Sequence, residues 1–304
     1  MMQSTTNWFD LPLDVKKNIL SRVGVVEKLW TVQKVCTDWH EMCKDPSMWR
    51  VINIDNELVV CCWPYDVPSG LPISRFKRRG AWEMCRNAVD RSQGQLVDIT
   101  MAGICDHELL EYVADSTLNK GTYTTNTCLL NVSVPNNKSS QLRRLRIAFP
   151  GLEDGSLSKA LKKLPFLEEL SIYFGSGYLQ LDIEALGKYC PMLRTLELID
   201  MSSYICDKEV IAIGENLPEL RHLKIISNYM LSNTGLQAIL DGCHCLQVLD
   251  LRLCLSIDLK GDVGKRLEHI ECVLHTEPYC DPYRLDYVMD LETYRKEVLM
   301  ISTF

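Results

Sequence analysis

The sequence lacks both a long apolar run and a leader-like start. None of its apolar stretches approaches the roughly 18 consecutive residues that a membrane-spanning helix needs. The opening MMQSTTNWFD has neither a basic start nor an apolar core, so we predict no secretory signal. Without a secretory signal, the 14 cysteines indicate a reducing compartment and free thiols. We therefore expect a location in the nucleus, the cytoplasm or both.

Excess basic charge and catalytic motifs are also missing. The formal net charge is −7, whereas a general nucleic-acid binder carries a basic surface. The sequence contains no phosphate-binding glycine loop, no G-x-S-x-G and no H-E-x-x-H. We therefore expect a protein without catalytic residues, cofactor or metal, and with neither nucleic acid nor membrane as a partner. Its 304 residues are enough for about two globular domains.

A repeat of 25 to 27 residues runs through the second half. Each copy contains L-x-x-L-x-[LI], the strand signature of a leucine-rich repeat. The five blocks are LRRLRI, LEELSI, LRTLEL, LRHLKI and LQVLDL, starting at Leu142, Leu167, Leu193, Leu220 and Leu246. An earlier block, LVDITM from Leu96, predicts a further strand before them.

An apolar helical face precedes the repeat strands. Its residues are spaced i, i+3 or i+4, and i+7, as in Val210, Ile213 and Leu217. Asp154, Asp207 and Asn233 lie three residues before such faces, where an N-cap is expected. A strand and a helix of this size cannot bury their apolar faces alone, so we predict an α/β fold in which the units stack as a curved solenoid. Cys190 and Cys243 are predicted to be small buried side chains between helix and strand.

The period is interrupted once, and it fades at both ends. Residues 117–139 are rich in Thr, Asn, Ser and Lys and are predicted to be an inserted loop. The basic stretch 74–80 is interpreted as a solvated connector, with a nuclear-import patch as the alternative. The predicted organisation is a helical domain at 6–52, a linker and leading helix at 53–92, repeats at 93–275, and a C-terminal cap or tail at 276–304.

The first fifty residues predict a small helical domain with many apolar and aromatic side chains. Within it, Cys36, His40 and Cys43 have the spacing C-x3-H-x2-C, which raises the possibility of a metal site. A structural zinc ion takes four ligands, and no fourth ligand is apparent nearby. The favoured interpretation is therefore helix packing for Cys36 and Trp39, with His40 as a solvated polar residue.

The N-terminal motif resembles the F-box. Over residues 6–52 the sequence reads L-P-x-D-x-x-x-x-I-L, then a leucine, then V-C-x-x-W and D-P-x-x-W, with Asp14 where glutamate is common. An F-box followed by leucine-rich repeats resembles the F-box/LRR family, and this compact form is most similar to plant members. The repeats resemble the cysteine-containing class, as in YCPMLRTLEL and GCHCLQVLDL.

The resemblance implies a substrate receptor of an SCF-type E3 ubiquitin ligase. The F-box would bind a Skp-family adaptor and, through it, a cullin and a RING protein. A scaffold or inhibitor acting outside a ligase is an alternative, and an unrecognised enzyme is another. The residues predicted to form or support the adaptor-binding face are Leu11, Pro12, Ile19, Leu20, Leu29, Val35, Cys36, Trp39 and Trp49.

A second predicted surface is the open side of the repeat strands. The leucines of each block point toward the helices, and the alternate residues face the concave side. These residues form a mixed-charge strip that is predicted to bind an unidentified protein substrate, with an ordinary solvated sheet face as the alternative. They are Arg144, Arg146, Glu169, Ser171, Tyr173, Thr195, Glu197, His222, Lys224, Asp250 and Arg252.

Overall fold

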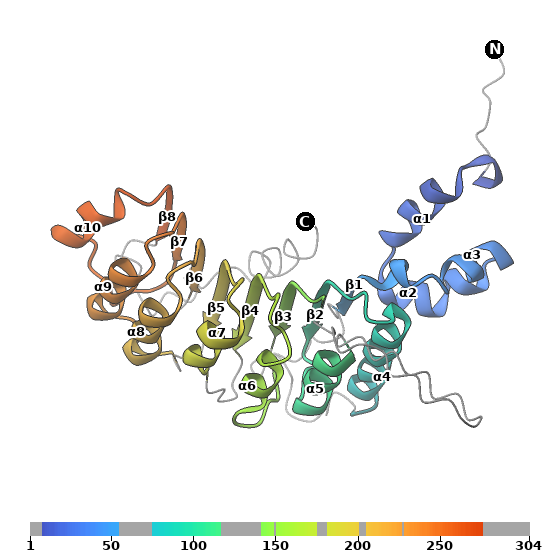
Figure 1. Ribbon diagram of the computed structural model, residues 1–304, viewed down its shortest axis with the longest axis horizontal. Helices are drawn as coiled ribbons and strands as arrows, with labels where there is room; N and C mark the ends of the chain where they lie inside the picture. The colour runs from blue at the N-terminus through green and yellow to red at the C-terminus, as the bar shows by residue number, and fades with distance from the viewer. Residues whose placement is uncertain are drawn as a thin grey trace, which may run out of the picture.

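The computed structural model describes residues 8–54, 75–116, 141–148, 150–174, 181–200, 205–226 and 228–275. Within these residues, eight parallel strands form one curved sheet in chain order, from β1 to β8. The solenoid helices cover the convex side of the sheet, and the N-terminal helices form an arm at the β1 end (Figure 1). The predicted α/β solenoid with a helical N-terminal domain is confirmed. None of the described helices is long and apolar enough to cross a membrane.

Short helices make up the N-terminal arm. Pro12 and Gly24 precede its first two α-helices, and Asp45 caps the last 3-10 helix by accepting a hydrogen bond from the Ser47 backbone N–H at 2.9 Å. The elements are η1 (Trp8–Asp10), α1 (Leu13–Ser21), α2 (Val25–Trp30), η2 (Val32–Lys34), α3 (Thr37–Met42) and η3 (Pro46–Trp49).

Strands and helices then alternate as the repeat pattern predicts. Each of the five repeat strands begins two residues after the first leucine of its block. In order, the elements are β1 (Val51–Ile54), α4 (Arg75–Ser92), β2 (Asp98–Ala102), α5 (His107–Ser116), β3 (Arg144–Ala148), α6 (Ser156–Leu161), β4 (Glu169–Phe174), α7 (Ile183–Tyr189), β5 (Thr195–Asp200), α8 (Asp207–Asn216), β6 (His222–Ile226), α9 (Asn233–Gly242), β7 (Val248–Leu251), α10 (Asp262–Leu267) and β8 (Cys272–His275).

The sheet begins earlier than the sequence predicted. β1 pairs with β2 from Val51↔Asp98 to Ile54↔Met101, so the predicted domain boundary at residue 52 lies inside a strand. At the interruption, β2 and β3 are neighbours, with Asp98 opposite Arg144. The predicted loop at 117–139 and the predicted tail at 276–304 lie outside the described residues.

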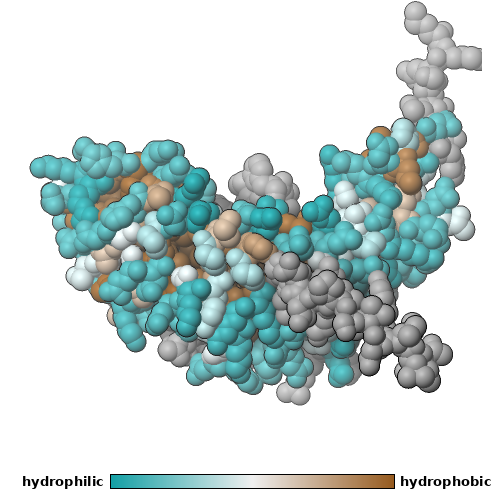
Figure 2. Space-filling view, in the orientation of Figure 1, coloured by the Kyte–Doolittle hydropathy of each residue, from teal (hydrophilic) through white to brown (hydrophobic). Residues whose placement is uncertain are grey.

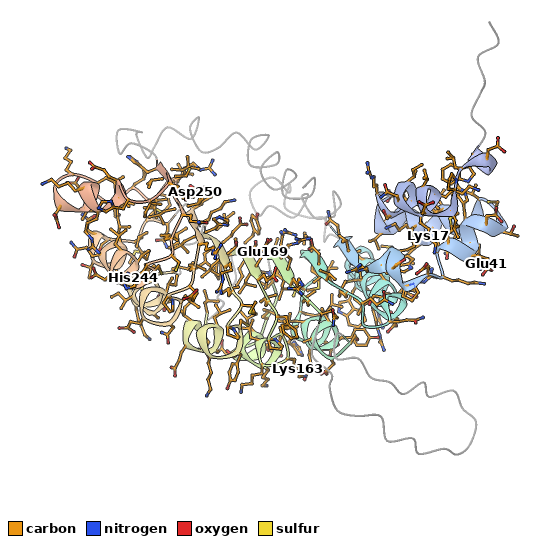
Figure 3. The ribbon with its side chains drawn as sticks, turned by 45° about the horizontal axis from the view of Figure 1, so that its top comes forward. Lys17, Glu41, Lys163, Glu169, His244 and Asp250 are labelled. Carbon is orange, nitrogen blue, oxygen red and sulfur yellow. The ribbon has the colours of Figure 1, made fainter. Side chains whose placement is uncertain are left out.

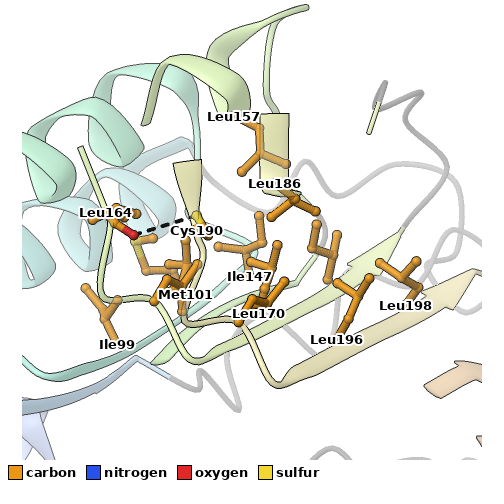
Figure 4. Close-up of a cluster of buried hydrophobic side chains, with 14 of the residues drawn as sticks. Ile99, Met101, Ile147, Leu157, Leu164, Leu170, Leu186, Cys190, Leu196 and Leu198 are labelled. Carbon is orange, nitrogen blue, oxygen red and sulfur yellow. Dashed lines mark hydrogen bonds between the residues drawn. The ribbon is translucent and has the colours of Figure 1, made fainter. Parts of the chain in front are cut away.

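A continuous apolar core joins the arm to the solenoid. The central leucines of successive strands are fully buried, and they meet helix residues such as Leu157 and Leu186 (Figure 4). Burying one leucine side chain stabilises a fold by about 1.5–3 kcal/mol. Because each unit depends on its neighbours for this burial, the core is built cooperatively along the sheet. The central strand leucines are Leu145, Leu170, Leu196, Leu223 and Leu249.

Cys190 and Cys243 are buried between helix and strand, as predicted. They are 1% and 4% exposed, respectively. The Cys190 thiol donates to the Leu164 carbonyl at 3.6 Å (Figure 4). Burial raises the pKa of each of these two thiols to about 12, so both stay protonated.

The predicted helix caps are displaced by one residue. The N-caps of α6, α8 and α9 are Gly155, Cys206 and Ser232, each directly after or before the residue predicted. Asp207 instead links two repeats, because its Oδ1 accepts a hydrogen bond from the Ser232 backbone N–H at 2.8 Å. Asn233 makes the next such link, with its Oδ1 2.8 Å from the Asp258 backbone nitrogen.

Glycines allow α8 and α9 to approach closely. A Cβ on Gly242 would lie 1.9 Å from the Gly214 carbonyl oxygen, and one on Gly214 would lie 2.2 Å from the Ala238 carbonyl oxygen. Both obstacles are backbone atoms, so they cannot rotate away as a side chain would. Any larger residue at these positions must push the two helices apart.

We predict that Gly214→Ala destabilises the protein by about 2 kcal/mol, because the clash outweighs the better helix propensity of alanine. The matched control is Gly80→Ala in α4, where no atom lies within 4 Å of the added Cβ. That control should be neutral or more stable by up to about 1 kcal/mol. Urea unfolding of both variants measures the difference. A Gly214→Ala protein as stable as wild type would contradict the packing argument.

Candidate functional site

The predicted adaptor-binding residues divide into exposed and buried members. Ile19 and Val35 are 43% and 55% exposed, and Pro12 is also exposed. Leu20 and Trp49 are at most 1% exposed, so they support the arm from inside. Leu11, Leu29, Cys36 and Trp39 are half-buried.

Four further apolar side chains are exposed on the same arm and were missed by the motif. They lie on α1 and α2, and Figure 2 shows hydrophobic surface gathered over the α1 region. Val15 and Ile19 are four residues apart on one helix, a spacing from which a shared face could have been predicted. The four are Leu13 at 59%, Val15 at 38%, Val26 at 37% and Trp30 at 61% exposed.

Buried polar contacts hold the arm together. The Trp49 indole N–H donates to the Cys43 carbonyl at 2.9 Å. The buried Lys28 Nζ donates to the carbonyls of Ser21 at 2.9 Å and Met48 at 3.2 Å, and burial lowers its pKa. These contacts connect the end of α1 to α2 and η3, so they fix the positions of the exposed apolar side chains.

Asp45 adds an electrostatic contact between α1 and η3. Its carboxylate accepts a hydrogen bond from Lys17, which Figure 3 labels on the arm. This bond, together with the one from the Ser47 backbone N–H, lowers the pKa of Asp45 to about 2. The aspartate of the D-P-x-x-W motif therefore has a structural role.

The two cysteines and the histidine of the possible metal motif lie at the ends of α3 and within it, and they differ in burial. Cys43 is 1% exposed, whereas His40 is exposed with its Nδ1 3.2 Å from the Gln33 carbonyl oxygen. Among the described residues, no group of three or more His, Cys, Asp or Glu side chains could hold a metal ion. Trp39 packs against Trp8, with ring centroids 5.1 Å apart.

The concave face consists of the strand residues that point away from the helices. Figure 3 labels two of them, Glu169 and Asp250, on the strand side of the solenoid, with Lys163 on the opposite side. The strand register places Arg144, Glu169, Thr195 and His222 in one row across the sheet. The alternation predicted from the leucine blocks therefore brings the predicted substrate-binding residues onto one face.

Charges on the concave face are paired between neighbouring strands. Asp98 accepts from Arg144 Nε at 2.7 Å and from Arg146 at 3.0 Å, and Arg146 also lies 3.3 Å from Glu169. Lys224 lies 2.8 Å from Glu197. Arg252 lies 2.8 Å from Asp250. The charges of four carboxylates and four cations on this face therefore balance: Asp98, Glu169, Glu197 and Asp250 with Arg144, Arg146, Lys224 and Arg252.

Asp98 is a concave-face residue that the sequence reasoning missed. Its side chain is 8% exposed, and it organises two of the predicted arginines. Asp98 could have been predicted to face Arg144, because it has the same position in the block LVDITM as Arg144 has in the next block, LRRLRI. Without Asp98, the two arginine side chains would repel each other.

Some predicted substrate-binding residues lie too deep for direct contact. Ser171, Tyr173 and Asp250 are buried at 2%, 4% and 0% exposure, and Ser171 Oγ donates to Glu197 at 2.9 Å. His222 is exposed, with its Nδ1 3.2 Å from Thr195 Oγ1. For the accessible residues, substrate binding stays a prediction. The buried residues support the accessible side chains of the concave face.

We predict that Asp98→Ala destabilises the protein by about 2–3 kcal/mol, because Arg146 is only 14% exposed and loses its main counter-charge. The matched control is Asp241→Ala, which removes an exposed pair with Arg266. Exposed pairs contribute at most about 1 kcal/mol, so the control should unfold almost like wild type. Chemical denaturation distinguishes the two. Equal, small losses in both variants would show that the concave pairs are not structural.

Comparison with known proteins gives matches over both parts of the chain. A family model described as F-box-like matches residues 8–55. Putative F-box/LRR-repeat protein 9 of Arabidopsis thaliana is 37% identical over 262 residues, which cover 85% of this chain and 92% of that protein. F-box protein SKIP19 of the same plant is 37% identical over 273 residues, covering 89% and 78%.

Two other matches are partial or distant. Putative F-box/LRR-repeat protein 23 of Arabidopsis thaliana is 40% identical over 269 residues, covering 86% of this chain but only 51% of that protein. The chain thus spans about half the length of that relative. Among solved structures, a chain of the yeast Rad7 and Elc1 complex aligns with a TM-score of 0.39 and 13% identity, covering 81% of this chain and 63% of that one. That likeness is too weak to bear on the fold.

Proposed function

Because the chain belongs to the F-box/LRR-repeat family, we propose that it is the substrate receptor of an SCF-type E3 ubiquitin ligase. In this role the N-terminal arm binds a Skp-family adaptor, and through it a cullin and a RING protein. The repeats bind the protein to be ubiquitinated. The chain contributes binding and positioning rather than catalysis, and it acts in the nucleus, the cytoplasm or both.

The observation that carries this proposal is the exposed apolar surface of the arm. Leu13, Ile19 and Val35 are each more than 40% exposed, although they sit in a small domain with a well-packed interior. Hydrophobic surface gathers over the α1 region (Figure 2), and an exposed apolar patch of this kind marks a site that a partner covers. Binding energy concentrates in a few such anchors, which fits recognition of a preformed partner.

The shared core of arm and solenoid also supports the proposal. β1 follows η3 directly and pairs with β2, and α4 contacts η3, β1 and α5. A protein held on the concave face would therefore have a defined position relative to an adaptor on the arm. Transfer of ubiquitin requires such positioning, because the modified lysine must reach a distant catalytic subunit.

We expect Ile19→Asp combined with Val35→Asp to reduce adaptor affinity by about 100-fold or more, because two exposed anchors become charged. The matched control is Tyr229→Asp with Leu274→Asp, two side chains of 46% and 41% exposure on the solenoid. The control should bind adaptor like wild type. Pull-down with purified adaptor, after circular dichroism confirms folding, measures both.

The same variants test the ligase role itself. Affinity purification from plant tissue with the proteasome blocked should recover adaptor and cullin with wild type and with the control variant. The Ile19→Asp, Val35→Asp variant should lose both. Recovery of adaptor without cullin by the wild-type protein would contradict the ligase role and favour the scaffold alternative.

For the concave face, we expect a charge swap to lower substrate capture without unfolding the protein. Glu197→Lys with Lys224→Glu keeps the ion pair but reverses the charge pattern that a bound protein meets. The control swap is Asp241→Arg with Arg266→Asp on the exposed helix side. Substrate and adaptor are quantified from one pull-down of each variant. Undiminished substrate with the first swap would place substrate binding elsewhere.

A further inference from the structure

A hollow whose lining includes two cationic side chains lies where the arm meets the solenoid. Its volume is about 340 Å³, large enough for a small ligand. The arm contributes residues from η2, from α3 and from the two positions after α3, and the solenoid contributes the end of α4 and the turn after it. The lining residues are Gln33, His40, Cys43, Lys44, Arg91 and Gln93.

Positive charge in the hollow is not balanced by its own walls. Lys44 and Arg91 are cationic, and none of the described lining residues is a carboxylate. Lys44 pairs with Glu41 at 2.7 Å, so its charge is balanced in part by a carboxylate outside the lining, and Arg91 is the cation without a carboxylate among the contacts of the described residues. Behind the wall, Lys28 is buried and bonded to carbonyl groups rather than to an acid in the described chain.

Arg91 is held in place before any ligand arrives. Its guanidinium carbon lies 5.1 Å from the centre of the Trp49 ring, and Nη1 donates to Gln33 Oε1 at 3.1 Å. The Gln33 carbonyl in turn lies 3.2 Å from His40 Nδ1. An arginine fixed by stacking and one hydrogen bond keeps the other edge of its planar fork for an oxyanion.

We propose that this hollow binds a small phosphate-bearing anion, with Arg91 as the main contact and with Lys44 and His40 as further donors. Phosphate offers more acceptor oxygens than a carboxylate, which suits a hollow whose lining donors come from three segments of the chain. Because the lining comes from both the arm and α4, a bound anion would also brace the junction between them. This site does not depend on the proposed ligase role.

The test uses the purified full chain and inorganic pyrophosphate as the probe, with sodium chloride added to keep ionic strength constant. We expect saturable heat in calorimetry and a saturable rise in melting temperature, because a ligand that binds only the folded state stabilises it. Arg91→Gln should raise the dissociation constant about tenfold or more, as expected for the loss of charge-assisted hydrogen bonds.

Arg86→Gln is the matched control. It removes the same charge from the same helix, and its guanidinium also stacks on an aromatic ring, 4.6 Å from the centre of the Tyr112 ring. This variant should bind pyrophosphate like wild type. Equal weakening in both variants would mean a general charge effect and would overturn the site.

Lys44→Gln keeps the test decisive if Arg91→Gln fails to fold. Lys44 is exposed on the rim, so its replacement should leave stability unchanged and weaken binding several-fold. A wild-type protein that gains no more stability from pyrophosphate than from chloride at equal ionic strength would overturn the proposal. Unchanged affinity in the folded Lys44→Gln variant would also contradict the assigned contacts.

Discussion

Backbone pairing between β1 and β2 is the contact on which the geometry of both surfaces depends. The Arg50 carbonyl accepts hydrogen bonds from the Val97 and Asp98 N–H groups at 2.8 and 3.2 Å. The same two-donor arrangement recurs at the start of each strand pair as far as Arg221, which accepts from Gln247 and Val248. In hydrogen-bonding terms, the end of the helical arm is thus the first turn of the solenoid. Because the pairing is continuous, the fold itself fixes the position of the arm relative to the repeats.

Packing on the convex side imposes a second constraint. The buried strand leucines set one side of each unit, and helices must then stack closely enough to exclude water from them. Where α8 meets α9, the closeness is possible because Gly214 and Gly242 carry no side chain. Asp207 and Asn233 link the helix starts of neighbouring repeats from the outside. Each repeat is therefore held by apolar burial within and by polar bonds at the edge.

The sequence predicted the repeat strands well because a leucine at a fully buried position leaves a strong and regular pattern. Strand β1 was not predicted, because its sequence VINI has only two buried residues, Ile52 and Ile54, and no L-x-x-L-x-L block. The role of Asn228 was also not predicted, although the leucine-rich repeat motif has an asparagine at this position after the strand. Its side chain donates a hydrogen bond to the Ile205 carbonyl and accepts one from the Leu231 backbone N–H.

For the candidate site, alternation along a strand correctly assigned residues to the concave face but could not give their accessibility. Ser171 is bonded to Glu197 of the neighbouring strand, and Asp250 is paired with Arg252. Whether a bound protein could contact either residue therefore depends on these other side chains. On the arm, the F-box motif mixes exposed residues with core residues, because Leu20 and Trp49 support a surface that they do not form. A sequence motif records both roles without distinguishing them.

The pairing of concave charges has a kinetic consequence. Opposite charges about 3 Å apart produce a field that fades within a short distance, and salt at physiological strength screens what remains beyond about 8 Å. A protein approaching this face is therefore not drawn in from afar, and its association rate would be near the unsteered range of about 10⁵–10⁶ M⁻¹ s⁻¹. For a protein bound on this face as proposed, discrimination between partners would rest on residence time, which depends on how well the partner's polar groups fit a face whose charges are already paired.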